Sequence, residues 1–311
     1  MVARPQSGVC AETSLHGLVL LCQLREGRLS AARLKLAKVP ALAKSLDERF
    51  SEALLTLFAA VGSRGWGRLC TSPQPPGLAP FPRFDHSLYG VAQNQFDLAF
   101  VIRSDRLDAN YFAGRVLQEW FAEDLQLVVE YQLFHYLDNR NLFGFKCPPT
   151  VHGRQRRGSC LVNAPNQPLW HQGSHLFLQH YVLDLDGWQE LTSDQQQQIV
   201  GHEKLSGARL ANSVGLGDTD DIDDKSHAGK TAVDDALPVV WQQLPSAGVR
   251  EHGHVELLWS HSTAALTEFV RRRVEEDSDG FSDPLLEYQN NTLSCALFVP
   301  PHGWFESLNS S

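Results

Sequence analysis

The chain has 311 residues, of which 42% are hydrophobic and 20% charged, and this composition supports a buried core and excludes wholesale disorder. With 27 Lys and Arg against 36 Asp and Glu, the formal net charge is −9, which is opposite in sign to that of proteins that bind nucleic acid through its phosphates. No apolar run of about 18 residues is present, so no transmembrane helix and no membrane partner are expected.

Targeting and redox features point to a cytoplasmic protein. Residues 1–14 contain no apolar segment after Arg4, so a secretory signal is not expected. The six cysteines form no CxxC pair, and their irregular spacing resembles neither a zinc site nor a small disulfide scaffold. Reduced thiols in a cytoplasmic protein are therefore predicted.

The first half of the chain alternates apolar strand patterns with helical ones. Apolar residues at three- and four-residue steps predict a helix that Pro40 interrupts, and Ser104 or Asp105 can cap a later helix. The predicted elements are a strand at 15–24, helices at 31–46 and 47–61, a proline-rich loop at 71–84, a strand at 95–103, a helix at 105–121 and a strand at 125–137.

The second half repeats this order of elements. Ser193 can cap a helix, and Pro300 ends the last strand. The predicted elements are a strand at 174–182, a helix from 193, an Asp-rich loop at 215–235, a strand at 255–259, a helix through 266–274 and a strand at 293–299.

Each half therefore follows the order β-α-β-β-α-β, or one close to it, which is the ferredoxin-like order. We predict an α+β protein of two ferredoxin-like halves whose antiparallel sheets pack together with helices outside, the dimeric α/β-barrel type. The predicted domains are residues 1–140 and 141–311.

Short motifs in a fixed order extend over nearly the whole chain. They are QSG at 6–8, QFDL at 95–98, RSDR at 103–106, NLFGF at 141–145, GSHLFLQHY at 173–181, VGHEK at 200–204, SH at 226–227 and LFVP at 297–300. Together they resemble the dye-decolourising (Dyp-type) peroxidases, a bacterial family of haem peroxidases with two ferredoxin-like halves. The resemblance implies haem b as cofactor, hydrogen peroxide or a small organic molecule as substrate, and a homo-oligomer.

His227 stands where this family supplies the axial ligand of the haem iron. Imidazole is a standard haem ligand, and an axial histidine usually donates its other ring N–H to an acceptor. Asp283 resembles the family's acceptor aspartate. Asp283 also precedes Pro284, so it can cap a helix, and the two roles are compatible. Without the resemblance, an ordinary loop histidine is the better explanation of His227.

On the opposite, distal side of the haem, the family keeps an aspartate and an arginine, and both are replaced here. Cys147 stands at the aspartate position and Trp241 at the arginine position, and Gln243 belongs to the same side. Peroxide cleavage needs a group that moves a proton and a donor for the developing charge, each commonly worth ~10²–10⁴-fold. A thiol with a reference pKa of ~8.5 and an indole N–H replace them poorly. Peroxidase activity is therefore expected to be weak or redirected.

Further residues around the implied haem remain open to two interpretations. His202 replaces an arginine of the family, and Lys204 either contacts a haem propionate or is an ordinary surface lysine. Leu258 is assigned to the haem pocket.

Other side chains could compensate for the lost distal groups, although a solvated basic loop is the simpler explanation for them: His152, Arg154, Arg156 and Arg157. His252 and His254, two residues apart on a strand, are only a weak indication of a metal-binding site. Two functions compete: a haem-binding member of the family with an altered distal side, and a haem-free pseudo-enzyme that binds a ligand or a partner.

Overall fold

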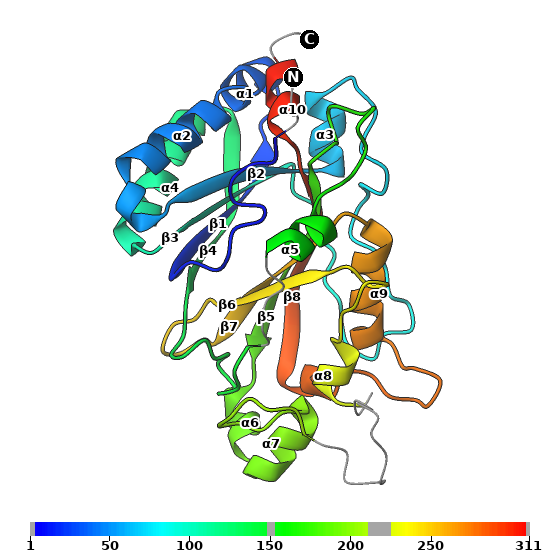
Figure 1. Cartoon of the computed structure of the whole chain (residues 1–311). Coiled ribbons are helices and arrows are strands. Elements are labelled where there is room, and N and C mark those ends of the chain that lie inside the picture. The colour runs from blue at the N-terminus through cyan, green and yellow to red at the C-terminus, as the bar shows by residue number, and fades with distance from the viewer. Residues whose placement is uncertain (1–3, 148–152, 211–224, 309–311) are drawn as a thin grey trace.

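The structure is a computed structural model that describes residues 4–147, 153–210 and 225–308 (Figure 1). The predicted Asp-rich loop at 215–235 lies partly outside these residues. The elements of the N-terminal half are β1 (His16–Leu24), α1 (Leu29–Leu36), α2 (Val39–Arg49), a 3-10 helix (Ser51–Ala53), β2 (Thr56–Gly62), α3 (Ser63–Leu69), β3 (Leu98–Ser104), α4 (Leu107–Phe121) and β4 (Leu125–Phe134).

The C-terminal half begins with a helix that the sequence patterns did not predict. Its elements are α5 (Gly153–Cys160), β5 (Ser174–Leu183), α6 (Leu185–Gln189), α7 (Ser193–Val200), α8 (His227–Lys230), β6 (Val240–Pro245), β7 (Gly253–Ser260), α9 (Thr263–Val274), a 3-10 helix η2 (Pro284–Tyr288), β8 (Gln289–Val299) and α10 (His302–Ser307).

The strands form one antiparallel sheet in the order β4-β1-β3-β2-β8-β5-β7-β6. Numbered within its own half, each group of four has the same spatial order, 4-1-3-2. This repeated order confirms the predicted α+β fold of two ferredoxin-like halves. The halves are joined edge to edge by a short pairing of β2 with β8, in which Val61 faces Phe298 and Gly62 faces Leu297.

The predicted helix at residues 47–61 is wrong. Helix α2 ends at Arg49, Leu54 adopts a left-handed conformation with φ of 51°, and β2 then begins at Thr56. Strand β2 is a central strand between β3 and β8, and apolar clusters cover both of its faces, so that Leu57 is buried on one face and Phe58 on the other. A strand buried on both faces loses the alternation that identifies strands, which explains the misassignment.

Three apolar clusters occupy the spaces between sheet and helices and between the two halves. One lies between the N-terminal strands and their helices, and a second contains Leu258, Phe269 and other residues of β7 and α9. The third lies where the other faces of the two halves meet, and Val101 and Trp259 belong to it. Strands β6 and β7 therefore have two different faces, one toward α8 and α9 and one toward the N-terminal half.

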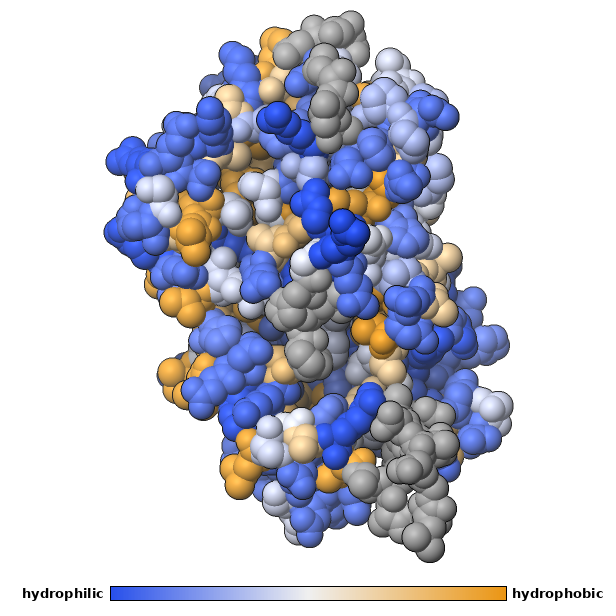
Figure 2. Space-filling view, in the orientation of Figure 1, coloured by the Kyte–Doolittle hydropathy of each residue, from blue (hydrophilic) through white to orange (hydrophobic). Residues whose placement is uncertain are grey.

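Figure 2 shows a mainly hydrophilic face on which hydrophobic residues form separate small patches. Within residues 4–147, 153–210 and 225–308, no helix has the length and apolar character needed to cross a membrane.

Candidate functional site

His227 and Asp283 form a buried hydrogen-bonded pair. His227 is the first residue of the short helix α8, which begins with Ser226 accepting the backbone N–H of Gly229. His227 Nδ1 lies 2.8 Å from Asp283 Oδ2, and the histidine is 7% exposed. The other oxygen of Asp283 accepts the backbone N–H of Leu285 at 3.0 Å, so the same carboxylate caps η2. The contact with Asp283 leaves Nε2 as the ring nitrogen available to a ligand.

A buried ionic chain continues from this pair into β7. Arg273 of α9 donates from Nε to Asp283 at 3.0 Å and from Nη1 to Glu256 at 2.7 Å. All three side chains are at most 1% exposed. Burial alone would raise the pKa of both acids, but nearby positive charge lowers each pKa to about 2, mainly from His227 at Asp283 and from Arg273 at Glu256. Arg273 thus holds two ionised carboxylates in the interior.

Gln243 and His254 extend the same network on the neighbouring strand. Gln243 pairs with Glu256 across β6 and β7, and its Nε2 donates to Glu256 Oε1 at 3.3 Å. The same nitrogen lies 3.1 Å from His254 Nε2. Burial lowers the pKa of His254, which favours its neutral form. Gln243 therefore belongs to the polar network that ends at His227.

Trp241 lies directly beside the histidine. Its ring centroid is 5.6 Å from that of His227, in an edge-to-face arrangement, and the guanidinium of Arg273 lies 5.7 Å from the indole. Leu258 is the cross-strand partner of Trp241 and is fully buried on the same face. The indole Nε1 is buried and has no hydrogen-bond partner among the described residues. The indole N–H of Trp241 is therefore a buried donor, without a partner among the described residues, next to His227.

Cys147 lies at the end of a loop that is fixed to the segment after α7. Arg140 donates to the backbone carbonyls of Gly144 and Lys204, both at 2.7 Å, and the backbone N–H of Cys147 donates to Asn139. Burial raises the pKa of the Cys147 thiol to about 11. The thiol is therefore neutral at pH 7 and cannot act as a general base there.

Lys204 and His202 lie on the segment between α7 and residue 210. Lys204 donates from Nζ to Gln196 at 2.6 Å and lies 5.6 Å from the ring of Phe145, and burial lowers its pKa. His202 is half-buried, and burial also lowers its pKa. Lys204 thus has a hydrogen-bond partner within the chain.

The basic segment after the altered loop does not form the predicted solvated loop. Residues 153–160 form α5, on which Arg154 and Arg157 are exposed but Arg156 is 1% exposed. Arg156 donates to the carbonyl of Ala11 at 2.6 Å, so it points toward the N-terminal half. His152 lies outside the described residues. The suggested metal pair also fails, because His252 precedes β7, His254 is engaged in the network, and the described residues include no cluster suited to a metal ion.

Sequence reasoning missed Arg273, Glu256 and the role of His254 in this network. A signal for the first two was present. Arg273 falls on the apolar face of α9, four residues after Phe269, and Glu256 stands between Val255 and Leu257 in an apolar strand. A charge on an inward-facing position requires a buried partner of opposite charge.

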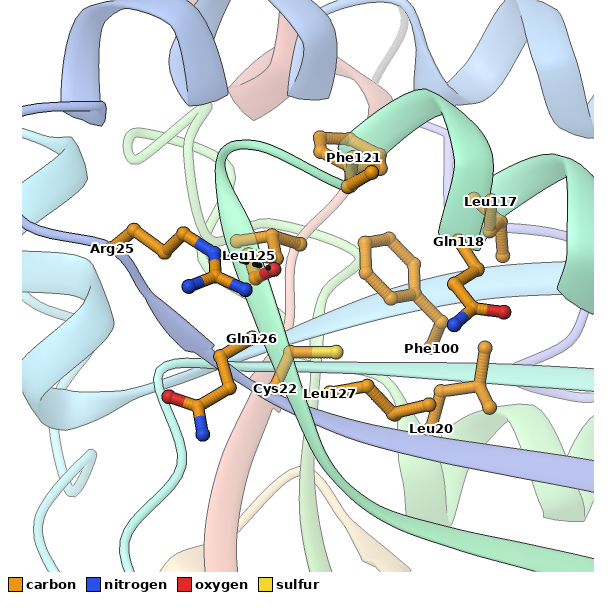
Figure 3. Close-up of a pocket in the computed structure, with 11 residues that line it drawn as sticks. Leu20, Cys22, Arg25, Phe100, Leu117, Gln118, Phe121, Leu125, Gln126 and Leu127 are labelled. Carbon is orange, nitrogen blue, oxygen red and sulfur yellow. Dashed lines mark hydrogen bonds between the residues drawn. The ribbon is translucent and has the colours of Figure 1, made fainter.

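A pocket of about 270 Å³ lies in the N-terminal half between β1, β3, β4 and α4 (Figure 3). Its walls are mainly apolar, with Arg25, Gln118 and Gln126 as polar groups and Cys22 on β1. Helix α4 occupies the place in this half that α9 occupies in the other. None of the predicted site residues lines this pocket.

Comparison with known families gives matches over both halves. Residues 18–134 match the family model described as "Dyp-type peroxidase, N-terminal", and residues 138–303 match the one described as "Dyp-type peroxidase, C-terminal". A dye-decolorizing peroxidase from Rhodococcus erythropolis is 22% identical over 91% of this chain and 83% of its own length. One from Mycobacterium tuberculosis is 24% identical over 85% of this chain and 79% of its own length.

Solved structures of similar fold cover almost the whole chain. The encapsulated DyP-type peroxidase of Mycobacterium smegmatis superposes with a TM-score of 0.89 at 21% identity, covering 97% of each chain. A dye-decolorizing peroxidase from Bacteroides thetaiotaomicron gives 0.88 at 20% identity, covering 99% of each chain. A variant of DypB from Rhodococcus jostii, solved in complex with heme, gives 0.86 at 22% identity, covering 98% of this chain and all of that one.

Proposed function

This chain belongs to the Dyp-type peroxidase family, and on that premise we propose that it binds haem b through His227 and has weak or redirected peroxide-dependent activity. The observation that carries the proposal is the buried His227–Asp283 hydrogen bond of 2.8 Å. A histidine whose Nδ1 is bound to a carboxylate has a fixed orientation and presents Nε2 to a metal.

The other side chains around His227 fit a bound haem only in part, because Trp241, whose ring centroid lies 5.6 Å from that of His227, has to move aside for a porphyrin to lie between them. Leu258 and Phe269 are fully buried apolar residues on the His227 side of β7 and α9, as a porphyrin ring requires. Trp241 Nε1 is a buried donor without a partner among the described residues, and such a donor is satisfied when a ligand group lies against it. Lys204 and His202 are the residues that we assign to the haem propionates.

Bound haem would supply the redox-active iron that reacts with peroxide. The chain itself holds and tunes the axial imidazole. Asp283 accepts the Nδ1 proton of His227 and makes the ring a stronger ligand. Arg273 donates to the same carboxylate oxygen, Oδ2, and withdraws part of its charge. The imidazole is therefore less basic than one paired with an isolated aspartate.

The distal residues explain the expected loss of activity. Peroxide cleavage requires a base that accepts a proton and returns it to the leaving oxygen. Cys147, with a thiol pKa of about 11, is protonated at neutral pH, and Trp241 offers one fixed N–H in place of a cation. Gln243 supplies an amide donor, but it is already engaged with Glu256. None of the three combines proton transfer with positive charge.

Haem binding is tested by titrating the purified protein with haemin and recording the Soret band. Wild-type protein is expected to shift the band. His227→Ala is expected to lose that shift, and Asp283→Asn to weaken binding. The matched control is His252→Ala, which changes a half-buried histidine outside the network and should bind as the wild type does. The absence of a Soret shift in wild-type protein would contradict the proposal and favour the haem-free pseudo-enzyme.

The distal part of the proposal is tested separately by rapid mixing of the haem-loaded protein with hydrogen peroxide. Slow spectral change is expected. Fast change, at the rate of a family member with both distal groups, would show that another side chain moves the proton.

We further propose a cytoplasmic homo-oligomer. The six free thiols fit a reducing compartment, and sedimentation velocity measures the assembly.

A further inference from the structure

Arg103 carries a buried charge for which the described residues provide no partner. It lies near the end of β3, is 1% exposed, and faces the cluster between the two halves. All three of its guanidinium nitrogens are buried, and none has a hydrogen-bond partner within the described part of the chain. An arginine has five N–H donors, so an arginine buried in this way has an unusually large number of donors without acceptors.

The immediate surroundings of Arg103 add donors and a second cation. Its Cζ lies 5.8 Å from the ring of Phe58 and 5.9 Å from the ring of Trp259. Trp259 Nε1 is likewise buried and without a partner among the described residues. Arg156 of α5, itself 1% exposed, lies close enough for its charge to act on Arg103. Burial first, and then this charge, lowers the pKa of Arg103 to about 9.

Interactions with the aromatic rings do not replace a counterion. A cation near a ring gains on the order of 1 kcal/mol, whereas an uncompensated buried ion costs several kcal/mol. The charge that affects the pKa of Arg103 comes from another cation, Arg156. Among the described residues, no carboxylate affects the pKa of Arg103. Arg103, a buried cation without a counterion among the described residues, and the neighbouring indole N–H of Trp259 are together complementary to an anion.

The shape of the donors narrows the class of anion. A guanidinium presents parallel N–H groups in a plane, which match the two oxygens of a carboxylate or a carbonate. We propose that Arg103, Arg156 and Trp259 form a binding site for a small planar oxyanion, of the carboxylate or bicarbonate class, buried between the two halves of the protein.

The site has contributions from both halves of the chain. Arg103 comes from β3 of the N-terminal half, and Trp259 and Arg156 come from β7 and α5 of the C-terminal half. Arg156 Nη2 and Gln242 Nε2 both donate to the carbonyl of Ala11, which holds the N-terminal segment beside them. A bound anion therefore stabilises the contact between the halves.

This site is distinct from the His227 site. Gln242 and Trp259 lie on the face of β6 and β7 that packs toward the N-terminal half, whereas Trp241 and Leu258 lie on the opposite face. Anion binding at Arg103 is thus expected to be independent of His227 and of any ligand bound there.

Thermal unfolding tests the proposal, with sodium formate, sodium bicarbonate and sodium chloride as separate probes at constant ionic strength, balanced with a bulky sulfonate. For wild type, the unfolding midpoint should rise with formate or bicarbonate and saturate, as mass action requires. Arg103→Met should lose this saturable rise, and His227→Ala should keep it. Arg25→Met, which removes an exposed arginine elsewhere, is the matched control and should respond as the wild type does.

Two further variants keep the test decisive if Arg103→Met does not fold. Arg103→Lys keeps the charge but loses the planar fork, and Trp259→Phe removes only the indole donor. Each should raise the anion concentration needed for half-saturation several-fold. Line broadening of ¹³C-formate by wild-type protein, absent with Arg103→Met, would show binding directly. The proposal is overturned if wild type shows no saturable response, if Arg103→Met responds equally, or if chloride alone acts.

Discussion

Replacing Arg273 by methionine should destabilise the protein strongly, because it removes a cation that two buried carboxylates share. Arg273 Nη1 lies 2.7 Å from Glu256 and Nε lies 3.0 Å from Asp283, and all three side chains are at most 1% exposed. Methionine fills similar apolar volume, so the substitution removes the charge and its hydrogen bonds while leaving only a small cavity.

The expected magnitude follows from the two ion pairs. Removing one member of a buried pair costs about 3–5 kcal/mol, because the remaining charge stays buried without compensation. Here two acids lose their cation, although Asp283 keeps His227 and a backbone N–H, and Glu256 keeps Gln243. A loss of about 4 kcal/mol in the free energy of unfolding at pH 7 is therefore expected. Arg272→Met, one residue away on the exposed side of α9, should change it by less than about 0.5 kcal/mol.

Guanidinium chloride unfolding at several pH values measures this loss and its sign. In the wild type, the pKa of Glu256 is lowered to about 2, so its contribution is present above the unfolded pKa near ~4.3 and is lost as pH falls toward 2. Without Arg273, burial raises the pKa of Glu256, so that the variant loses stability as pH rises. The difference between the two proteins should therefore be largest near pH 7 and shrink toward pH 4.

Two results would refute this reasoning. One is a loss of less than about 1 kcal/mol at pH 7, which would mean that water or movement of the chain compensates the carboxylates. The other is a difference between wild type and variant that does not change with pH. The double variant Arg273→Met with Glu256→Gln should recover part of the stability, because it removes the charge that the single variant leaves unpaired.

Two more predictions concern the distal side and the thiols. The double variant Trp241→Arg with Cys147→Asp should accelerate the peroxide reaction of the haem-loaded protein by ~10²-fold or more, as measured by rapid mixing, because it supplies a cation and a proton acceptor; an unchanged rate would show that these positions do not face the peroxide. Cys10 should react with iodoacetamide at pH 7.5 much faster than Cys22, as followed by mass spectrometry. A hydrogen bond from Cys160 and nearby arginines outweigh burial and lower the pKa of Cys10 to about 7, whereas burial raises the pKa of Cys22 to about 12. Equal reaction rates would contradict these pKa shifts.

Local sequence patterns were sufficient for much of the architecture. Turn residues and apolar runs gave most of the strands and the main helices, and the motif order identified the Dyp-type family, which the two family models confirm. Motifs are short and local, so they can be recognised without knowing what packs against them. For the same reason they pointed to His227 and Asp283, which are 56 residues apart in the chain but each stand in a recognisable local context.

The second strand of each half could not be read in this way. Strand β2 is buried on both faces by neighbours that are distant in sequence, and β6 is a short edge strand that pairs only with β7. In both cases the information lies in the pairing partner rather than in the segment itself. The sequence order of apolar residues is the same for a buried strand and for part of a buried helix.

What the sequence determined by itself is the family and most of the order of elements, since these depend on local patterns and motifs. That Cys147 and Trp241 replace the distal residues stays a prediction from the same motifs. What only the tertiary structure decided is which charges meet. Arg273 donates hydrogen bonds to Glu256 and Asp283, whereas Arg103 lies near Arg156 and two aromatic rings. Side chains on adjacent positions of β6 and β7 face opposite sides of the sheet, so a shift of one residue in register would exchange these partners. Charge pairing in the interior is therefore fixed by strand register, which no local pattern specifies.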